Sequence, residues 1–374
     1  MKKMIALVLA MVLLLCGCGK APVETQPTTA APTTAPTEAT TEPTTEPTTA
    51  PTTEPAPVYT NPLNGEILEE PYDGRLFAVT ISNIPDALPH VGVTEADIYM
   101  EMFVNGSIIR GLALYTDITG VETIGSVRST RLMFNDIVTH YDALLAHAGG
   151  SSQVLTDARN RGLDNFNIDT WDRTSYSFRD ETRKKLGWEH CLMGIGSGLV
   201  EHAAEKGMAT TQDPEKSYNL TFAEDGTPAG GEAADEITVR ITYHGTWKDT
   251  TMKYDPALGE YAYWQYGKLM ADGVTGEPET FENVVIMFAN ISKEGIYHVA
   301  DFVAGGEGYF ACGGQLIPIK WGCDGEDQPF WFTTQDGEPL PFGVGSTYIA
   351  ITTPDSPVTY SAAEPEVPET TETE

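Results

Sequence analysis

The spacing of apolar residues gives the first part of the chain an alternation of strand-like and helix-like runs. The strand-like runs are residues 76–81, 97–103, 111–115 and 143–147, and the helix-like runs are residues 131–141, 151–161 and 197–206. The former are short and apolar, whereas the latter carry apolar side chains three and four positions apart. Serines stand near the start of the last two helix-like runs, where a hydroxyl can cap a helix. This order predicts an α/β domain over residues 61–210.

The pattern changes after residues 211–235, a polar stretch rich in Gly, Pro, Asp and Glu that predicts an interdomain linker. From residue 236 to residue 354, short alternating runs follow one another between turn residues, and helical spacing nearly disappears. The runs are 237–243, 251–254, 261–266, 284–289, 297–303, 308–311, 316–320, 330–333 and 347–352. A β-rich C-terminal domain is therefore predicted to follow the α/β domain.

The first eighteen residues have the pattern of a secretory signal peptide. Two lysines precede an apolar run over residues 5–15, which is too short to span a bilayer comfortably. The run ends in Leu15-Cys16-Gly17-Cys18, which resembles a bacterial lipobox with Cys18 as the lipid acceptor. An ordinary cleaved signal with an incidental cysteine is the alternative. The lipobox predicts a protein anchored to the outer face of the bacterial cell membrane, and therefore extracytoplasmic.

Composition separates both ends from the folded body. Residues 19–60 repeat Pro, Thr, Ala and Glu with few large apolar side chains, which predicts a disordered stalk. Residues 355–374 predict a disordered acidic tail. The whole chain carries 22 Lys and Arg against 54 Asp and Glu, a net charge of -32. Such a charge disfavours binding to nucleic acid or coating of anionic lipid, although it leaves room for a local basic site.

Three cysteines remain once Cys16 is removed with the signal and Cys18 is lipidated: Cys191, Cys312 and Cys323. An odd number cannot pair completely within one chain. Three free thiols are the favoured interpretation, and a disulfide between Cys312 and Cys323 is the alternative. The chain has no CxxC or HExxH motif, so neither a metal site nor a cofactor is expected.

The first candidate for chemistry is a basic run just before a predicted helix. Arg128-Ser129-Thr130-Arg131 places two guanidinium groups around two hydroxyls. Guanidinium groups match phosphate and carboxylate oxygens, and a helix N-terminus adds free backbone N–H groups. The run therefore predicts an anion-binding corner. In the alternative interpretation, a hydroxyl only caps the helix and the arginines pair with acidic side chains.

The second candidate is the turn that follows the apolar run at residues 143–147. His147 is followed by Gly149, Gly150, Ser151 and Ser152 and then by a predicted helix. Ligands of open α/β sheets bind beyond the carboxyl ends of strands, and glycine lets backbone approach a ligand closely. The turn is neither a Walker A nor a GxSxG motif. A buried, hydrogen-bonded histidine beside a glycine turn is the alternative.

Two carboxylates are candidates to assist His147 in catalysis. Glu101 lies in an apolar run and shares a strand face with Tyr99 and Phe103, so we expect it to need a buried partner, with Arg110 across a hairpin as the expected one. Asp142 just precedes the strand that carries His147. Either could serve a histidine base, although a structural ion pair explains Glu101 as well.

Trp171 and Trp188 lie in a loop-rich region with several charged residues, including Asp169, Arg173 and Arg179. Exposed tryptophan beside polar groups suits contact with a sugar or a peptide, whereas buried tryptophan is ordinary core. Both interpretations stay open at this point.

The chain resembles the YerB-like lipoproteins, secreted bacterial proteins built from a two-part domain of unknown function. The resemblance rests on residues 78–83, 96–101, 124–131, 141–143, 147–151, 308–310 and 319–321. The C-terminal end departs from it, because family members commonly read Pro-Gly-Lys-Thr-Trp where this chain has Gly343-Val344-Gly345-Ser346-Thr347-Tyr348. The resemblance implies a membrane-anchored extracellular protein with an α/β part and a β part. It implies no reaction and no catalytic residues.

The leading hypothesis is a surface lipoprotein whose first domain binds an anionic or polar ligand of the cell envelope, such as a wall fragment or a phosphosugar. One alternative is a hydrolase or transferase that acts on envelope polymers through His147 with Glu101 or Asp142. Another is a non-catalytic assembly factor that docks a protein partner, whose identity the sequence does not indicate. The expected partners are the membrane, through the lipid anchor, and a cell-wall or phosphosugar ligand; nucleic acid is not expected, and a protein partner stays unidentified.

Overall fold

The computed structural model describes residues 57–213 and 216–363. The predicted signal peptide, Cys18 and the greater part of the stalk and tail lie outside this range. The described residues form one compact unit, and the description below concerns that unit.

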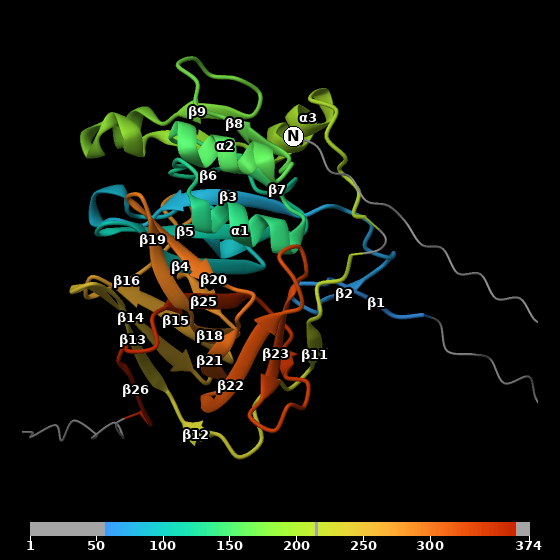
Figure 1. The fold of residues 1–374 in the computed structure, drawn as a ribbon, viewed down its shortest axis with the longest axis vertical. Coiled ribbons are helices and arrows are strands. Elements are labelled where there is room, and N and C mark those ends of the chain that lie inside the picture. Colours follow the sequence, from blue (N-terminus) through green and yellow to red (C-terminus); the bar gives the residue numbers. More distant parts are fainter. Residues whose placement is uncertain (1–56, 214–215, 364–374) are drawn as a thin grey trace, which may run out of the picture. The chain divides into compact units, whose positions relative to one another are not determined.

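A 13-stranded sheet forms the centre of the unit (Figure 1). Its strands in spatial order are β12 (Glu232–Ala233), β22 (Gln315–Cys323), β21 (Gly306–Cys312), β18 (Asn283–Phe288), β25 (Thr347–Thr352), β4 (Ile98–Asn105), β5 (Ile108–Tyr115), β3 (Phe77–Ser82), β7 (Leu144–His147) and β8 (Asn165–Asn167). The strands that branch from this path are β19 (Asn290–Glu294), β20 (Tyr297–Asp301) and β23 (Phe330–Thr334).

Smaller sheets surround the large one. A six-stranded sheet contains β16 (Lys268–Leu269), β15 (Glu260–Gln265), β14 (Thr246–Asp255), β13 (Glu236–Tyr243), β26 (Val358–Ser361) and β17 (Thr280–Phe281). The short sheets are β1 (Tyr59–Thr60) with β2 (Ile67–Leu68), β6 (Ile124–Gly125) with β10 (Leu192–Gly194) and β9 (Ser177–Arg179), and β11 (Thr221–Ala223) with β24 (Pro341–Gly343).

Helices are few and lie in the first part of the chain. The α-helices are α1 (Leu132–Tyr141), α2 (Ser152–Asn160) and α3 (Gly196–Glu205), and the 3-10 helices are Pro85–Ala87, Val93–Glu95, Glu181–Leu186 and Trp188–His190. Within residues 216–363 the structure contains no helix, as the missing helical periodicity predicts. The described part of the chain is therefore β-rich, and its helices lie within the predicted α/β part.

Strands from both predicted parts share the large sheet. Strand β25, from the end of the chain, lies parallel between β18 and β4, and it pairs Ala350 with Glu101. On the other side of β4 the order is β5, β3, β7 and β8, with parallel pairing only among the last three. The parts that the sequence separates are thus joined by a continuous ladder of backbone hydrogen bonds.

Both faces of the large sheet are buried at β4, which explains why this strand is apolar at nearly every position apart from Glu101. Tyr99 and Phe103 face one hydrophobic cluster, which also contains the inner side chains of the six-stranded sheet. Met100 and Met102 face a second cluster, which contains the apolar side of α1. The period-two alternation correctly assigned Glu101 to the face of Tyr99 and Phe103, the one covered by the six-stranded sheet.

The three predicted α-helices are present within one or two residues of their expected bounds. Ser151 caps α2, because its Oγ accepts a hydrogen bond from the backbone N–H of Val154 at 3.4 Å. The expected serine cap of α3 is wrong, since Ile195 occupies that position without a side-chain hydrogen bond. Likewise neither Ser129 nor Thr130 caps α1, whose cap position is Arg131.

The predicted stalk, tail and linker differ from the structure at their inner edges. Strand β1 lies within the last residues predicted as stalk, and β26 lies within the predicted tail, where it pairs with β13. The predicted linker contains β11, which pairs with β24, and β12, which pairs with β22. Alternation over only two to four residues is too short to stand out in a polar sequence, so pairing with a longer strand decides these elements.

The three predicted free cysteines, Cys191, Cys312 and Cys323, are buried and unpaired, which confirms the favoured interpretation. In the part of the chain that the structure describes, every helix is too short or too polar to cross a membrane.

Candidate anion-binding site

The two runs singled out in the sequence meet at the carboxyl end of β7. The backbone N–H of Ala148 donates to the carbonyl of Arg128 at 2.9 Å, and the N–H of Thr130 donates to the carbonyl of Gly149 at 3.0 Å. The segment at residues 126–128 also bonds to the end of β3. The backbone N–H of Arg128 donates to the carbonyl of Thr80, and the N–H of Ser82 donates to the carbonyl of Ser126, both at 2.9 Å. We call residues 128–131, the turn at residues 147–152 and Arg110 the basic corner.

Three arginines gather in the basic corner. Arg110, on β5, and Arg131 both donate through Nη1 to the carbonyl oxygen of Ser129, in the second case at 3.1 Å. Arg131 also reaches the carbonyl of Thr130 at 2.7 Å and Oδ1 of Asn105 at 2.8 Å. The guanidinium groups are thus held by neutral oxygens, which position them without neutralising their charge.

No carboxylate forms a direct ion pair with Arg110, Arg128 or Arg131 among residues 57–213 and 216–363, although the charges of Glu189 and Asp169 act on Arg128 from a greater distance. Burial, and after it the charges of Arg131 and Arg128, lower the pKa of Arg110 to about 8. Burial also lowers the pKa of Arg131 to about 10, and Arg128 acts in the same direction. Because guanidinium keeps its proton in proteins, these shifts reflect mainly the cost of burying charged groups and, to a smaller extent, their mutual repulsion, both of which a bound anion would reduce.

His147 is buried within the turn, and both of its ring nitrogens are occupied. Nδ1 lies 2.9 Å from the carbonyl oxygen of Gly149, and Nε2 lies 3.1 Å from Oδ1 of Asn165. Burial lowers the pKa of the ring below its usual value. An enclosed ring whose two nitrogens lie against oxygens of Gly149 and Asn165 holds the turn in shape, in agreement with the structural alternative.

The remaining turn residues form the surface of the basic corner. Gly149 has a φ of 70°, a conformation that favours glycine, and its N–H donates to Oδ1 of Asn167 at 2.8 Å. Gly150 packs beside Thr130, and Ser152 is exposed at the start of α2. The hydroxyl of Ser151 accepts the helix-capping bond and keeps its proton free to donate to a ligand.

Glu101 lies in a different environment, a buried polar network between the large sheet and the six-stranded sheet. Its carboxylate is 0% exposed and pairs with Lys248 of β14, which is 6% exposed. Tyr348 donates to Oε2 at 2.6 Å and Thr250 at 2.9 Å. The expected partner Arg110 is therefore wrong, because Arg110 lies opposite Met102 on β4. Its side chain leaves the other face of the sheet, where it binds the carbonyl of Ser129.

The network continues from Glu101 through side chains of both parts. Asn83 donates to Oε1 of Glu101 at 2.7 Å, and its own Oδ1 lies 3.1 Å from Nε2 of His90. Nδ1 of His90 in turn lies 3.0 Å from the carboxylate of Glu279. Every one of these side chains is buried, so the network ties the parts together and offers no surface to a ligand.

The three candidate catalytic side chains are not bonded to one another. Asp142 pairs with Arg75 at 2.9 Å, and it ends α1 in a left-handed conformation with a φ of 48°. His147 contacts Gly149 and Asn165, and Glu101 contacts Lys248. The structure thus brings together the residues predicted for binding and leaves the residues predicted for catalysis apart.

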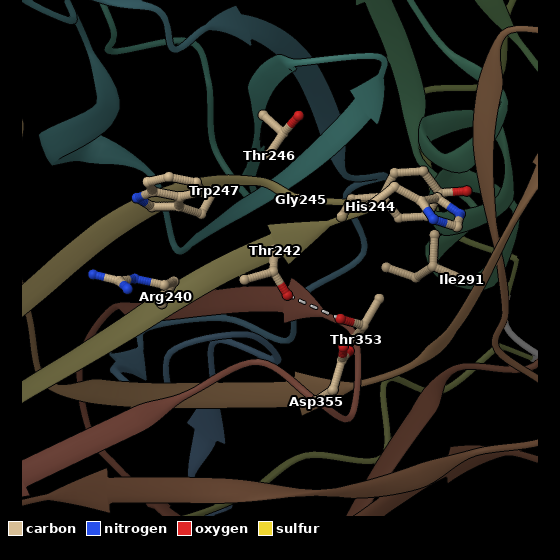
Figure 2. A pocket seen from close by; sticks show the side chains of 10 residues that line it. Arg240, Thr242, His244, Gly245, Thr246, Trp247, Ile291, Thr353 and Asp355 are labelled. Carbon is tan, nitrogen blue, oxygen red and sulfur yellow. Dashed lines mark hydrogen bonds between the residues drawn. The ribbon is translucent and has the colours of Figure 1, made fainter.

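A hollow of about 420 Å³ lies at the turn between β13 and β14 (Figure 2). Trp247 and Arg240 lie at one end and His244 and Ile291 at the other, while Thr242 and Thr353 share a 3.1 Å hydrogen bond. Arg240 is neutralised by Asp249 at 2.7 Å. The hollow therefore lacks the uncompensated charge that distinguishes the basic corner.

The sequence interpretation missed the role of Arg110 in the basic corner. The sequence nevertheless contained a signal for it: Arg110 is a cation inside the apolar run of β5, with no acidic residue beside it. A cation on a buried strand requires a polar or charged partner. Lys248 was missed as well, although alternation along β14 places it on the same inward face as the buried Met252.

The continuous sheet and the arginine-lined corner define a two-part, β-rich protein with a candidate site for an anion. The chain matches family models described as "Protein of unknown function (DUF3048) N-terminal domain" over residues 63–209 and "Protein of unknown function (DUF3048) C-terminal domain" over residues 239–349. The chain belongs to this two-part family, as the resemblance in the sequence implied.

Two comparisons concern a single relative. A Bacillus subtilis (strain 168) protein described as "Putative lipoprotein YerB" is 28% identical over 298 residues, which are 78% of this chain and 85% of that protein. The crystal structure of the YerB protein from Bacillus subtilis matches with a TM-score of 0.67 at 24% identity, over 80% of this chain and 99% of that one. This second likeness establishes the fold.

Proposed function

We propose that the chain is a membrane-anchored extracellular lipoprotein that binds an anionic, envelope-derived ligand at the basic corner. The observation that carries the proposal is the set of three arginines without a carboxylate partner, within a chain of net charge -32. Within the described ranges, Arg183 is likewise held by backbone carbonyls without an ion pair, so the basic corner is distinguished by three guanidinium groups that lie close together. A cluster of like charges supports a ligand that supplies negative charge.

The anchoring part of the proposal rests on two supports. The lipobox ending at Cys18 is the expected acceptor of the lipid, and the Bacillus subtilis relative carries the word lipoprotein in its description. Two acyl chains on one cysteine suffice for stable membrane attachment. Ligands available to such a protein include the polymers of the envelope, many of which carry phosphate or carboxylate groups.

The test is titration of the purified folded body with phosphodiester-linked sugar oligomers released from a bacterial wall. Replacing Arg128 and Arg131 together by alanine is expected to weaken binding at least about tenfold, because charge-assisted hydrogen bonds contribute roughly 1.5–3 kcal/mol each. The same double replacement by glutamine removes both charges but keeps an amide N–H donor at each position, and it is expected to weaken binding as well. Raising the salt concentration is expected to weaken ligand binding by the wild-type protein more than ligand binding by either variant.

A matched control removes two positive charges elsewhere. Arg240→Ala with Lys253→Ala changes the net charge equally, on the exposed face of the six-stranded sheet, where each cation pairs with a partly exposed acid. This control is expected to bind as the wild type does. Equal affinity of the wild type and the Arg128, Arg131 variants, with folding verified by thermal unfolding, would show that the basic corner is not the site.

A further inference from the structure

Two exposed tryptophans stand beside the basic corner. Trp171 is 83% exposed and Trp188 is 41% exposed, and their ring centroids lie 5.3 Å apart. Large aromatic surface left in water is unfavourable, so two adjacent exposed tryptophans indicate a contact surface. The sequence left open whether these two tryptophans are contact residues or ordinary core, and the structure places neither ring in the core.

Arg179 holds this aromatic pair in place. Its Nη1 donates to the carbonyl of Trp188 at 2.8 Å, and its guanidinium lies 4.3 Å from the centroid of the Trp188 ring. Another nitrogen binds the carboxylate of Asp169, two residues before Trp171. Arg179 thus packs against Trp188 and links it to the loop of Trp171, so the exposed rings are held in fixed positions.

Consecutive carbonyls connect the aromatic pair to the basic corner. Arg128 donates through Nη1 to the carbonyl of Glu189 at 3.1 Å, while Arg179 binds the carbonyl of the preceding residue, Trp188. Trp188 and Glu189 are consecutive residues of the 3-10 helix Trp188–His190, and adjacent Cα atoms are 3.8 Å apart. The two guanidinium groups therefore bind close together on one short helix. The charge of Arg128 and the tryptophan pair therefore belong to one surface.

We propose that Trp171 and Trp188 form a sugar-stacking subsite of the basic corner, and that the ligand is an anionic carbohydrate. The apolar C–H face of a pyranose ring packs against the tryptophans, while its phosphate or carboxylate contacts the arginines. This inference rests on the proposed function, and it narrows the ligand from any anion to one that combines a sugar ring with a negative charge.

The experiment compares four probes on the purified folded body: inorganic phosphate, a neutral oligosaccharide, a phosphodiester-linked sugar oligomer and a uronic acid oligomer. Trp171→Ala combined with Trp188→Ala is expected to weaken binding of at least one anionic oligomer about three- to tenfold. Binding of inorganic phosphate is expected to stay unchanged. The two anionic oligomers distinguish phosphate from carboxylate as the source of the charge.

Trp247→Ala serves as the matched control, because Trp247 is 60% exposed and also lies beside an arginine, 5.7 Å from Arg240. It is expected to leave every affinity unchanged. If the tryptophan variants bind anionic oligomers normally while the Arg128, Arg131 variants lose them, the subsite is disproved and the proposed function survives. If the neutral oligosaccharide binds as tightly as the anionic ones, the ligand class is wrong. If no anionic probe binds the wild type, both proposals fail.

Discussion

Breaking the buried pair of Glu101 and Lys248 is expected to destabilise the whole folded unit. Glu101→Gln removes the charge that offsets the buried ammonium group and leaves Lys248 enclosed between two sheets. Loss of one partner of a buried ion pair costs about 3–5 kcal/mol. Because both side chains are nearly inaccessible to water, the upper part of that range applies, and water cannot replace the missing carboxylate.

The double variant distinguishes the loss of one charge partner from the general effect of changing a buried side chain. Glu101→Gln with Lys248→Met removes both charges at nearly constant volume, and it is expected to recover about half or more of the lost free energy of unfolding. The single variant should also depend on pH. Burial lowers the pKa of Lys248 in the folded state, so the unfolded chain binds more protons above that pKa, and the stability of Glu101→Gln rises as the pH increases.

The assay is urea unfolding, followed by tryptophan fluorescence and by circular dichroism. Since the network and the continuous sheet join the two family-matched parts, both signals are expected to change in one transition. Removal of the exposed pair Arg240 and Asp249 is the control, with an expected cost below about 1 kcal/mol. A cost as small as this for Glu101→Gln, or a double variant as unstable as the sum of the single ones, would refute the reasoning.

Two further predictions concern the basic corner. Affinity for a phosphodiester ligand is expected to vary less than about twofold between pH 7 and 8 in calorimetric titrations, because burial lowers the pKa of His147 below its usual value and so favours the neutral ring over this interval; a marked gain from pH 8 to pH 7 would mean that the histidine acts as a cation. Ser151→Ala is expected to lower the free energy of unfolding by about 1 kcal/mol through loss of the helix cap. Ser151→Asp keeps the cap and adds a negative charge to the corner, so it should retain stability in the same denaturation assay while it weakens anion binding.

The sequence predicted the parts of the candidate site that depend on neighbouring residues. The helical spacing after residue 131, the serine that caps α2 and the glycine turn after β7 are properties of short segments, and all are present. The meeting of residues 128–130 with the glycine turn rests on backbone hydrogen bonds between separate segments, which these local patterns do not specify.

Other contacts required the complete chain. The pairing of Glu101 with Lys248 joins residues 147 positions apart, and a nearby arginine was an equally reasonable partner on the basis of the sequence. Arg110 could be assigned to the basic corner only once the register of β5 against β3 was known. The connection of Trp188 to Arg128 depends on a backbone carbonyl, for which no residue type gives a signal.

The order of the strands also separates what the local sequence predicts from what the folded chain decides. Alternation along residues 347–352 predicted a strand, and the structure inserts it between β18 and β4, so that residues near the end of the chain complete the sheet begun near its start. A strand's own residues specify that its faces are buried, but its neighbours are selected by the packing of all the side chains around it. Periodicity and local capping are encoded in adjacent residues, whereas partners, register and the environment of buried charges result from contacts that exist only in the folded protein.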